Sequence, residues 1–222
     1  MTSSRWFRLL LLILALLVIV ACSTEPKSAT NAETVSAATS AKTTAKIPQP
    51  ITATQALQKM EGYAQKQWAQ DAMPVHIESE PNSEANGQDG KATVWMAVFG
   101  SMRKGEIRTF HWSGSLDPSA PVAGVSAAPG SSPLNSEMAS QMFQSFLVKS
   151  DTDKAATIAV EHGGQNILKK FPDQRVKYIL VFDTKANTPL VYVVYGEELK
   201  KNKGFGVINA ITGDYVRGGK AG

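Results

Sequence analysis

Four residues of the chain, Ser101-Met102-Arg103-Lys104, have the spacing of a catalytic Ser-x-x-Lys. In enzymes that use this pattern the tetrapeptide opens a helix, and the lysine helps to deprotonate the serine. Here it falls in a connection between two expected strands, and the sequence contains no Ser-Asp-Asn, Lys-Thr-Gly or Gly-x-Ser-x-Gly partner motif. The sequence therefore carries no signature of a serine hydrolase, and a hydrolase of unrecognised type stays an alternative.

The three histidines, His76, His111 and His162, do not match a metal signature such as His-Glu-x-x-His. His76 and His111 fall on neighbouring expected strands, where their side chains could approach each other. No further cysteine is available as a ligand and no carboxylate sits at a ligand spacing. We therefore expect neither a metal nor a cofactor. Convergence of His76, His111 and a carboxylate in a deep pocket would favour the hydrolase alternative.

The only cysteine, Cys22, ends a short apolar run near the start of the chain. Arg5 and Arg8 form a positive region, residues 9–20 are continuously apolar, and Ala21 is a small residue before a cleavage point. A transmembrane helix needs about 20 apolar residues, and this run is shorter. The pattern predicts a secretory signal peptide at residues 1–21.

Residues 19–22, Ile-Val-Ala-Cys, resemble the lipobox of bacterial lipoproteins. In that class the cysteine thiol takes a diacylglyceryl group, and the signal peptide is then removed on its N-terminal side. The resemblance implies lipidation of Cys22, contact with a membrane through that lipid, and a place in the bacterial cell envelope. In a Gram-negative cell, Ser23 rather than Asp after the cysteine resembles the outer-membrane default, with the protein facing the periplasm.

The charge of the mature chain is close to balance. Removing Arg5 and Arg8 from the 23 Lys and Arg residues leaves 21, against 19 Asp and Glu. A nucleic-acid-binding domain normally shows a clear basic excess, so we expect no nucleic-acid partner.

Two segments with few large apolar residues divide the rest of the chain. Residues 22–50 are rich in Ala, Ser, Thr, Lys and Pro, which predicts a disordered tether. Residues 114–134 are rich in Gly, Ser, Ala and Pro, which predicts a linker. These segments delimit a first unit at 51–113 and a second at 135–217, followed by a tail at 218–222.

The first unit shows one helical pattern followed by alternating patterns typical of strands. Apolar residues follow a helical period over residues 52–71, with Thr52 or Thr54 as the N-cap. Asn86-Gly87 and Asp89-Gly90 suit a hairpin tip between the first two strands. We expect strands at residues 74–80, 91–100 and 105–112.

The second unit repeats this order of elements. Residues 135–148 carry a helical stripe, and residues 150–153 cap a short helix that Gly163-Gly164 would end. Strands are expected at residues 175–183, 190–195 and 204–210. The middle strand is apolar on both faces, so it belongs at the centre of an antiparallel sheet. The fold class is therefore α+β, with two tandem units that each pack a helix on a three- to four-stranded antiparallel sheet.

The second unit resembles a PepSY-type, cystatin-like domain. The resemblance rests on the Ala-rich short helix, Gly163-Gly164, the Val/Tyr strands and the closing Asn209-Ala-Ile-Thr-Gly213, where the family often has Asp-Ala-x-Thr-Gly. By element order alone, residues 52–112 resemble a degenerate second copy. The family includes propeptides that inhibit or chaperone secreted peptidases, so the resemblance implies binding and supplies no catalytic residue.

Five aromatic residues could belong either to a core or to a recognition surface: Trp68, Trp95, Trp112, Tyr192 and Phe205. Most of them stand at helical or mid-strand positions, which favours the core. We assign Trp112 and Tyr192 to a candidate binding surface, together with the basic tip at Lys200, Lys201 and Lys203. The leading hypothesis is a non-catalytic, lipid-anchored protein that binds an envelope protein, with a peptidase among the candidates. The alternatives are a hydrolase and a carrier of a small molecule or lipid, and the sequence does not indicate an oligomeric state.

Overall fold

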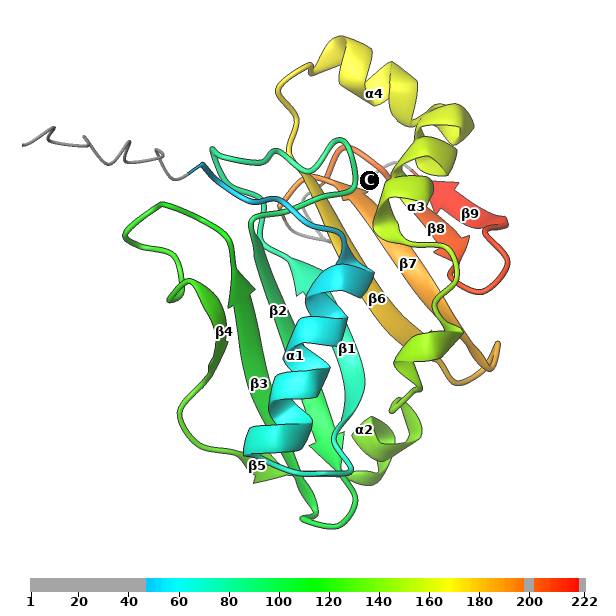
Figure 1. Ribbon diagram of the computed structural model, residues 1–222. Coiled ribbons are helices and arrows are strands. Elements are labelled where there is room, and N and C mark those ends of the chain that lie inside the picture. The colour runs from blue at the N-terminus through cyan, green and yellow to red at the C-terminus, as the bar shows by residue number, and fades with distance from the viewer. Residues whose placement is uncertain (1–46, 198–201, 220–222) are drawn as a thin grey trace, which may run out of the picture. The chain divides into compact units, whose positions relative to one another are not determined.

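Strands from both halves of the chain form one antiparallel sheet in the computed structural model (Figure 1). The structure describes residues 47–197 and 202–219, all of which belong to one compact unit. Within these residues the strand order is β4-β3-β2-β1-β6-β7-β8-β9, and β5 pairs with β3. The strands are β1 (Met73–Ser79), β2 (Val94–Ser101), β3 (Glu106–Ser113), β4 (Gly124–Ala127), β5 (Ser132–Pro133), β6 (Val176–Asp183), β7 (Thr188–Tyr195), β8 (Phe205–Asn209) and β9 (Tyr215–Gly219).

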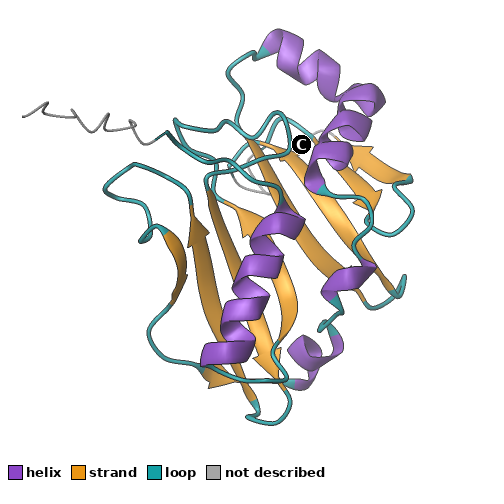
Figure 2. Cartoon of the chain, in the orientation of Figure 1, coloured by secondary structure: helices purple, strands orange, loops and turns teal. Residues whose placement is uncertain are grey.

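The two longest helices lie on the same face of this sheet (Figures 1 and 2). One packs on β1, β2 and β3, and the other packs on β7 and β8. The opposite face, turned away from the viewer in Figure 1, is covered by neither, and we call it the outer face. The helices are α1 (Ala53–Gln67), α2 (Ser136–Ser140), α3 (Thr152–Ala159) and α4 (Gln165–Lys170).

A single hydrophobic core fills the space between the helices and the sheet across both halves. On the α1 side, Leu57 and Met60 are fully buried together with Phe99 and Phe110. Small alanines on α3 let that helix lie close to β7 and β8. Because one core serves both halves, the two units predicted from the sequence are not separate sheets.

The two halves meet where β1 pairs with β6. Only three residue pairs form this ladder, with Ile77 and Leu180 at its centre. The Tyr178 backbone N–H donates to Ser79 Oγ at 2.9 Å, and Lys177 Nζ lies 3.1 Å from Glu78 Oε1. We call this joint the seam.

The N-termini of α1 and α3 share their capping groups. Asp151 Oδ1 accepts from the Thr152 N–H at 2.7 Å, and also from the Thr54 N–H of α1 at 3.1 Å. Thr152 Oγ1 accepts from the Ala53 N–H at 3.1 Å. The first N–H groups of a helix have no partner within it, so these bonds satisfy donors that burial would otherwise leave unpaired.

The loop between β1 and β2 also joins the halves. Gly87 and Gly90 both have positive φ, as the sequence predicts, but the loop is not a free hairpin tip. Tyr178 Oη donates to the Gly87 carbonyl at 2.7 Å, and Thr152 Oγ1 donates to the Gly90 carbonyl at 2.6 Å. This loop therefore packs on the second half of the chain.

The first predicted helix and the six predicted strands are confirmed, with ends that move by a few residues. Three other expectations are wrong. The expected linker contains β4 and β5, which pair with β3 because Val125 and its neighbours complete that edge of the sheet. The helical stripe at 135–148 forms only α2 and a 3-10 turn, Ser145–Leu147. Gly163-Gly164 does not end the helical segment but kinks it, with φ 112° at Gly163, and α4 follows before β6.

Replacing Gly90 by Ala tests the contact between the loop and the second half. An added Cβ would lie 2.4 Å from backbone atoms of Asp153, whereas at Gly105, whose φ is also positive, it would meet open space. Gly105→Ala should lower the free energy of unfolding by roughly 1–2 kcal/mol, the cost of a left-handed backbone. Gly90→Ala should cost a further 1–3 kcal/mol, roughly the penalty of overpacking. Urea denaturation measures both, and equal losses would contradict the packing of this loop.

Candidate functional site

A row of directly opposed residues crosses the outer face, with one member from each of eight strands. Directly opposed residues of an antiparallel pair point to the same face of the sheet, so the register fixes the row. From β4 to β9 the row is Ser126, His111, Met96, Glu78, Ile179, Tyr192, Val207 and Arg217.

The outer face is mostly apolar near its middle. Next to this row lie Val98, Val181 and Leu190, which face the same way by register. Tyr192 is half-buried, and its hydroxyl accepts from Arg217 Nη2 at 3.3 Å. The partly buried Lys177–Glu78 pair crosses the seam on this face. Leu190 and Val207 on this face are buried, at 3% and 0% exposed, and the other apolar side chains of the row are partly buried.

His76 and His111 lie on this face but do not meet. Strand β2 separates them, and the register offsets them by two residues. With strands about 4.8 Å apart and about 6.8 Å between alternate residues, their Cα atoms are about 12 Å apart. In residues 47–197 and 202–219, no three His, Cys, Asp or Glu side chains are placed to hold a metal ion. The arrangement named above as favouring a hydrolase is therefore not present in this part of the chain.

The Ser-x-x-Lys tetrapeptide forms a turn rather than a nucleophile site. The Ser101 hydroxyl is buried and donates to Asp71 Oδ1 at 2.7 Å, while the Lys104 backbone N–H donates to Ser101 Oγ at 3.1 Å. The Arg103 N–H donates to Asp71 Oδ2 at 2.9 Å. Burial alone would raise the pKa of Asp71, but the hydrogen bonds from Arg103 and Ser101 lower it overall. The carboxylate therefore accepts hydrogen bonds that close the turn between β2 and β3.

The candidate binding residues named from the sequence are dispersed. The prediction that Trp112 belongs to a binding surface is wrong, because this residue is only 5% exposed and belongs to the core on the helix side of the sheet. Tyr192 lies on the outer face, and Lys203 is exposed at the far end of β7 and β8. Cys22, Lys200 and Lys201 lie outside the described residues.

Strand β9 is a feature that the sequence analysis missed. Its residues pair with β8 on one side, and no described strand pairs with its outer edge. Val216 is 49% exposed and Arg217 is exposed beside it. Gly218 and Gly219 lower the strand propensity of this segment, although Val216 next to an aromatic Tyr215 could have suggested a strand. An open edge presents unpaired backbone groups to an incoming strand.

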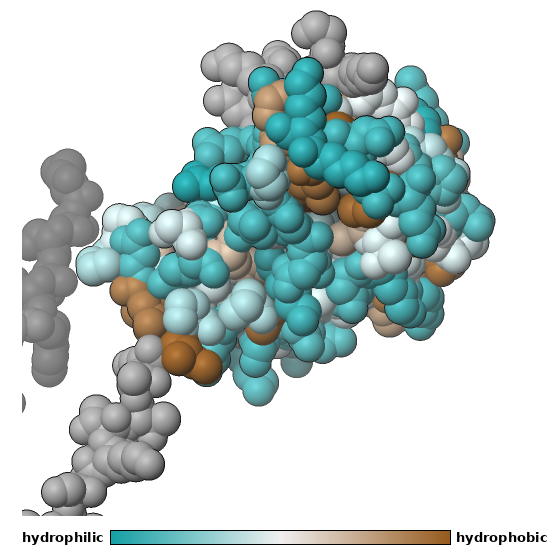
Figure 3. Space-filling view, turned by 90° about the horizontal axis from the view of Figure 1, so that it is seen from above, coloured by the Kyte–Doolittle hydropathy of each residue, from teal (hydrophilic) through white to brown (hydrophobic). Residues whose placement is uncertain are grey.

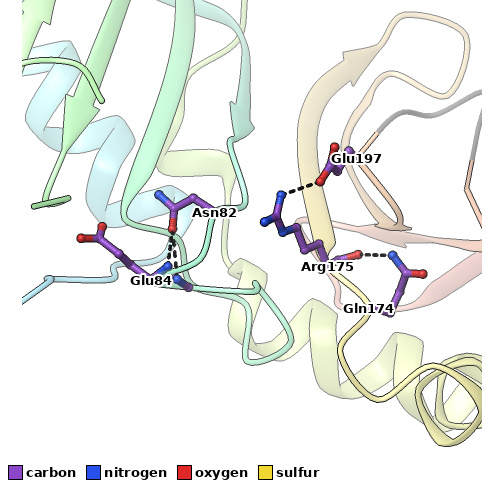
Figure 4. A network of polar contacts seen from close by, with 6 residues as sticks. Asn82, Glu84, Gln174, Arg175 and Glu197 are labelled. Atoms are coloured by element: carbon purple, nitrogen blue, oxygen red, sulfur yellow. Dashed lines mark hydrogen bonds and ion pairs between the residues drawn. The ribbon is translucent and has the colours of Figure 1, made fainter. Parts of the chain in front are cut away.

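Near one end of the seam, polar contacts within each half hold the loops of that half (Figure 4). Arg175 Nη1 lies 2.6 Å from Glu197 Oε1, and Asn82 Oδ1 accepts from the backbone N–H groups of Glu84 and Ala85. Seen from the end that carries α4, the surface is largely hydrophilic with small hydrophobic patches between (Figure 3). These contacts shape loops and bring together no nucleophile and base.

Comparisons with known proteins do not establish a family for this chain. No family model and no curated protein matches the chain. The chain is similar in structure to the crystal structure of "a putative lipoprotein (CD1622)" from Clostridium difficile 630, at 12% sequence identity and a TM-score of 0.45. The match covers 72% of this chain and 88% of that one. A likeness of this size carries no argument about fold or function.

None of the helices that the structure describes is both long enough and apolar enough to cross a membrane.

Replacing His76 tests the electrostatics of the outer face. Burial lowers the pKa of His76 below its usual value of 6.5. The nearby Glu78 carboxylate opposes this shift, the Lys177 ammonium adds to it, and the net change is downward. As the pH falls below about 6.5, His76 is protonated more readily in the unfolded chain than in the folded chain. Acidification through this range therefore lowers the free energy of unfolding through His76. His76→Gln should therefore lose less stability than the native chain between about pH 7.5 and about pH 5.5.

The measurement is the free energy of unfolding by urea at both pH values. His111→Gln, on the same face, is the matched control. If the native chain and His76→Gln lost the same stability on acidification, His76 would not be held neutral on this face.

Proposed function

We propose that the chain is a lipid-anchored protein of the bacterial envelope whose folded part binds an extended segment of another envelope protein without catalysis. The observation that carries the proposal is the open edge of β9 beside the apolar outer face. In this binding mode the backbone of the partner adds a strand to the sheet, and neighbouring side chains supply specificity.

The anchor rests on the sequence around Cys22. The lipobox-like residues 19–22 and the polar segment after them suit a protein held to a membrane by acyl chains. Two or more such chains bind a bilayer stably, whereas one binds reversibly. A tether of roughly 28 residues would let the folded part sit on the order of 30 Å from the membrane, within reach of other envelope proteins. The outer membrane, facing the periplasm, is the location proposed for a Gram-negative host.

The proposal includes kinship with PepSY-type modules at the level of architecture. In each half a helix precedes three consecutive antiparallel strands, which supports two related units fused through their first strands. The closing turn supports it as well. Asn209 Oδ1 accepts from the Ile211 N–H at 2.9 Å and the Thr212 N–H at 3.2 Å, and Gly213 has φ 82°. Asn209 thus makes the turn that an Asp would make at this position.

The anchor is tested by mass spectrometry of the mature protein from membranes. We expect an N-terminal Cys22 that carries a diacylglyceryl group, and Cys22→Ala should remain unlipidated. Ser23→Ala is the matched control, because it leaves the thiol in place and should stay lipidated. A free Cys22 thiol in the native protein, or cleavage at another bond, would contradict the anchor.

The binding edge is tested by photo-crosslinking in cells. A photoreactive residue at position 216 should give a defined adduct with one envelope protein, whereas the same residue at the exposed position 102, in the β2–β3 turn, should not. Val216→Lys should reduce copurification of that protein by about tenfold or more, because lysine on an edge opposes strand addition.

Val122→Lys is the matched control for Val216→Lys, because it adds the same positive charge at another exposed valine. Val122 is 78% exposed in the loop between β3 and β4, far along the sheet order from β9. This variant should copurify the partner like the native chain. Equal copurification by Val216→Lys and the native chain, with both folded, would remove β9 from the proposal.

A further inference from the structure

A pocket of about 860 Å³ lies between the kinked helical segment of α3 and α4 and the strands β8 and β9. Its size falls within the range of about 300–1,000 Å³ that is typical of small-molecule sites. A second hollow of about 680 Å³ adjoins it and shares Lys170, Phe171, Tyr195 and Lys203 with it. Neither Val216 nor the apolar middle of the outer face lines the pocket.

One side of the pocket carries two cations around an aromatic ring. Lys170 Nζ and Lys203 Nζ lie 5.4 Å and 5.3 Å from the centroid of the Phe171 ring. Among the described residues, no carboxylate lies within 4.0 Å of either ammonium group; Asp173 and Glu197 line the adjoining hollow, where Glu197 pairs with Arg175, and no described Asp or Glu lines the pocket itself. Two cations that share one ring and have no described carboxylate partner favour an anionic ligand group.

Another part of the pocket lining is an aromatic wall made by the stacked pair His162 and Tyr215. The rings of His162 and Tyr215 stack with centroids 4.0 Å apart and planes within 6°. Gly218 makes room for this wall, since an added Cβ would lie 2.0 Å from Tyr215 Oη. The two inner ring faces cover each other, so the edges and the outer ring faces are what this pair can offer to a planar or apolar group.

A buried hydroxyl in the pocket wall has no partner in the described part of the chain. Tyr195 is 2% exposed, its hydroxyl makes no hydrogen bond there, and Gly164 lies against it so closely that a Cβ could not fit. Burial, and then the neighbouring Tyr215, raise the pKa of Tyr195 to about 12, so the hydroxyl keeps its proton near neutral pH. A ligand with an acceptor atom would supply the missing partner.

We propose that this pocket binds a small organic anion with a planar, apolar body, placing its charged group near Lys170 and Lys203 and its body against His162 and Tyr215. The pocket shares strand β9 with the proposed partner edge through Tyr215, Gly218 and Gly219, but titration of the chain without a partner measures anion binding alone. Failure of the pocket proposal and failure of the proposed function are therefore distinguishable.

The test is calorimetric titration of the mature lipidated chain in lipid nanodiscs with phenyl phosphate, which combines a ring and an anion. Empty nanodiscs correct for binding to the lipid. Phenyl phosphate should bind at least about tenfold more tightly than inorganic phosphate or phenol, because only it uses both sides of the pocket. Absence of binding, or equal affinity for inorganic phosphate, would overturn the proposal.

Charge variants locate the site. Lys170→Gln and Lys203→Gln should each weaken phenyl phosphate binding by about fivefold to tenfold, as expected for the loss of one nearby cation. Lys66→Gln, an exposed change in the last turn of α1, is the matched control and should bind like the native chain. Unchanged binding by both pocket variants, with unfolding temperatures equal to that of the native chain, would place any bound probe elsewhere.

Removing the unpartnered hydroxyl gives a second readout. Tyr195→Phe should leave the free protein as stable as the native chain or more so, since an unsatisfied buried group is lost. The rise in unfolding temperature caused by phenyl phosphate should be smaller in this variant. The same rise in both proteins would contradict the assignment of Tyr195 to the ligand.

Discussion

The ladder between β1 and β6 is the contact on which the rest of the structure depends. It contains three residue pairs, yet it turns two sets of strands into one sheet. So short a ladder would be weak alone. It is reinforced on the outer face by the Lys177–Glu78 pair and on the helix side by the bond from the Tyr178 N–H to Ser79. The loop that carries Gly87 and Gly90 closes one end of the joint.

Shared helix caps extend the same joint into the helical layer. Asp151 and Thr152 satisfy donors at the start of α1 as well as at the start of α3, so neither helix begins independently of the other. A helix N-terminus buried without partners is costly, and each half supplies what the other half needs. The two halves are therefore expected to fold and unfold as one cooperative unit.

Local pattern predicted most of the elements but not how they join. The apolar period of α1 and the alternation of β2 and β7 are properties of short stretches, and the structure has them where the sequence indicates. The pairing of Ile77 with Leu180 brings together residues about a hundred positions apart, and no local pattern encodes it. The same holds for Trp112. Its position at the end of a predicted strand suggested a surface residue, whereas its pairing with β4 and its place in the core depend on contacts that the local sequence does not encode.

The candidate sites were the least predictable part of the chain. Strand β9 lies in a glycine-containing stretch with low strand propensity. The wall of the pocket at the other proposed site depends on the kink at Gly163, which the sequence suggested as a helix end. Kinks arise where glycine or a widened helical turn interrupts the hydrogen-bond ladder, and whether the helix then resumes depends on packing beyond it. Tyr195 and Tyr215 reach the pocket from strands β7 and β9, which pair with β8 between them.

The two proposed sites share strand β9 but use different parts of the frame around it. The outer face and the edge of β9 are proposed for an extended segment of a partner, whereas the partly open pocket beside the kinked helix is proposed for a small anion. Both use the second half of the chain, and the first half contributes the frame through the seam.

Amide hydrogen exchange, followed by mass spectrometry on the protein in isolated membranes and again after purification, tests the central claim most directly. The account predicts slow exchange at the seam, residues 76–79 and 176–181, in both samples, because the seam is intrinsic to the fold. It predicts slower exchange at residues 215–219 in membranes than after purification, because a partner strand pairs with β9 only there. Equal exchange at β9 in both samples, or fast exchange at the seam, would contradict it.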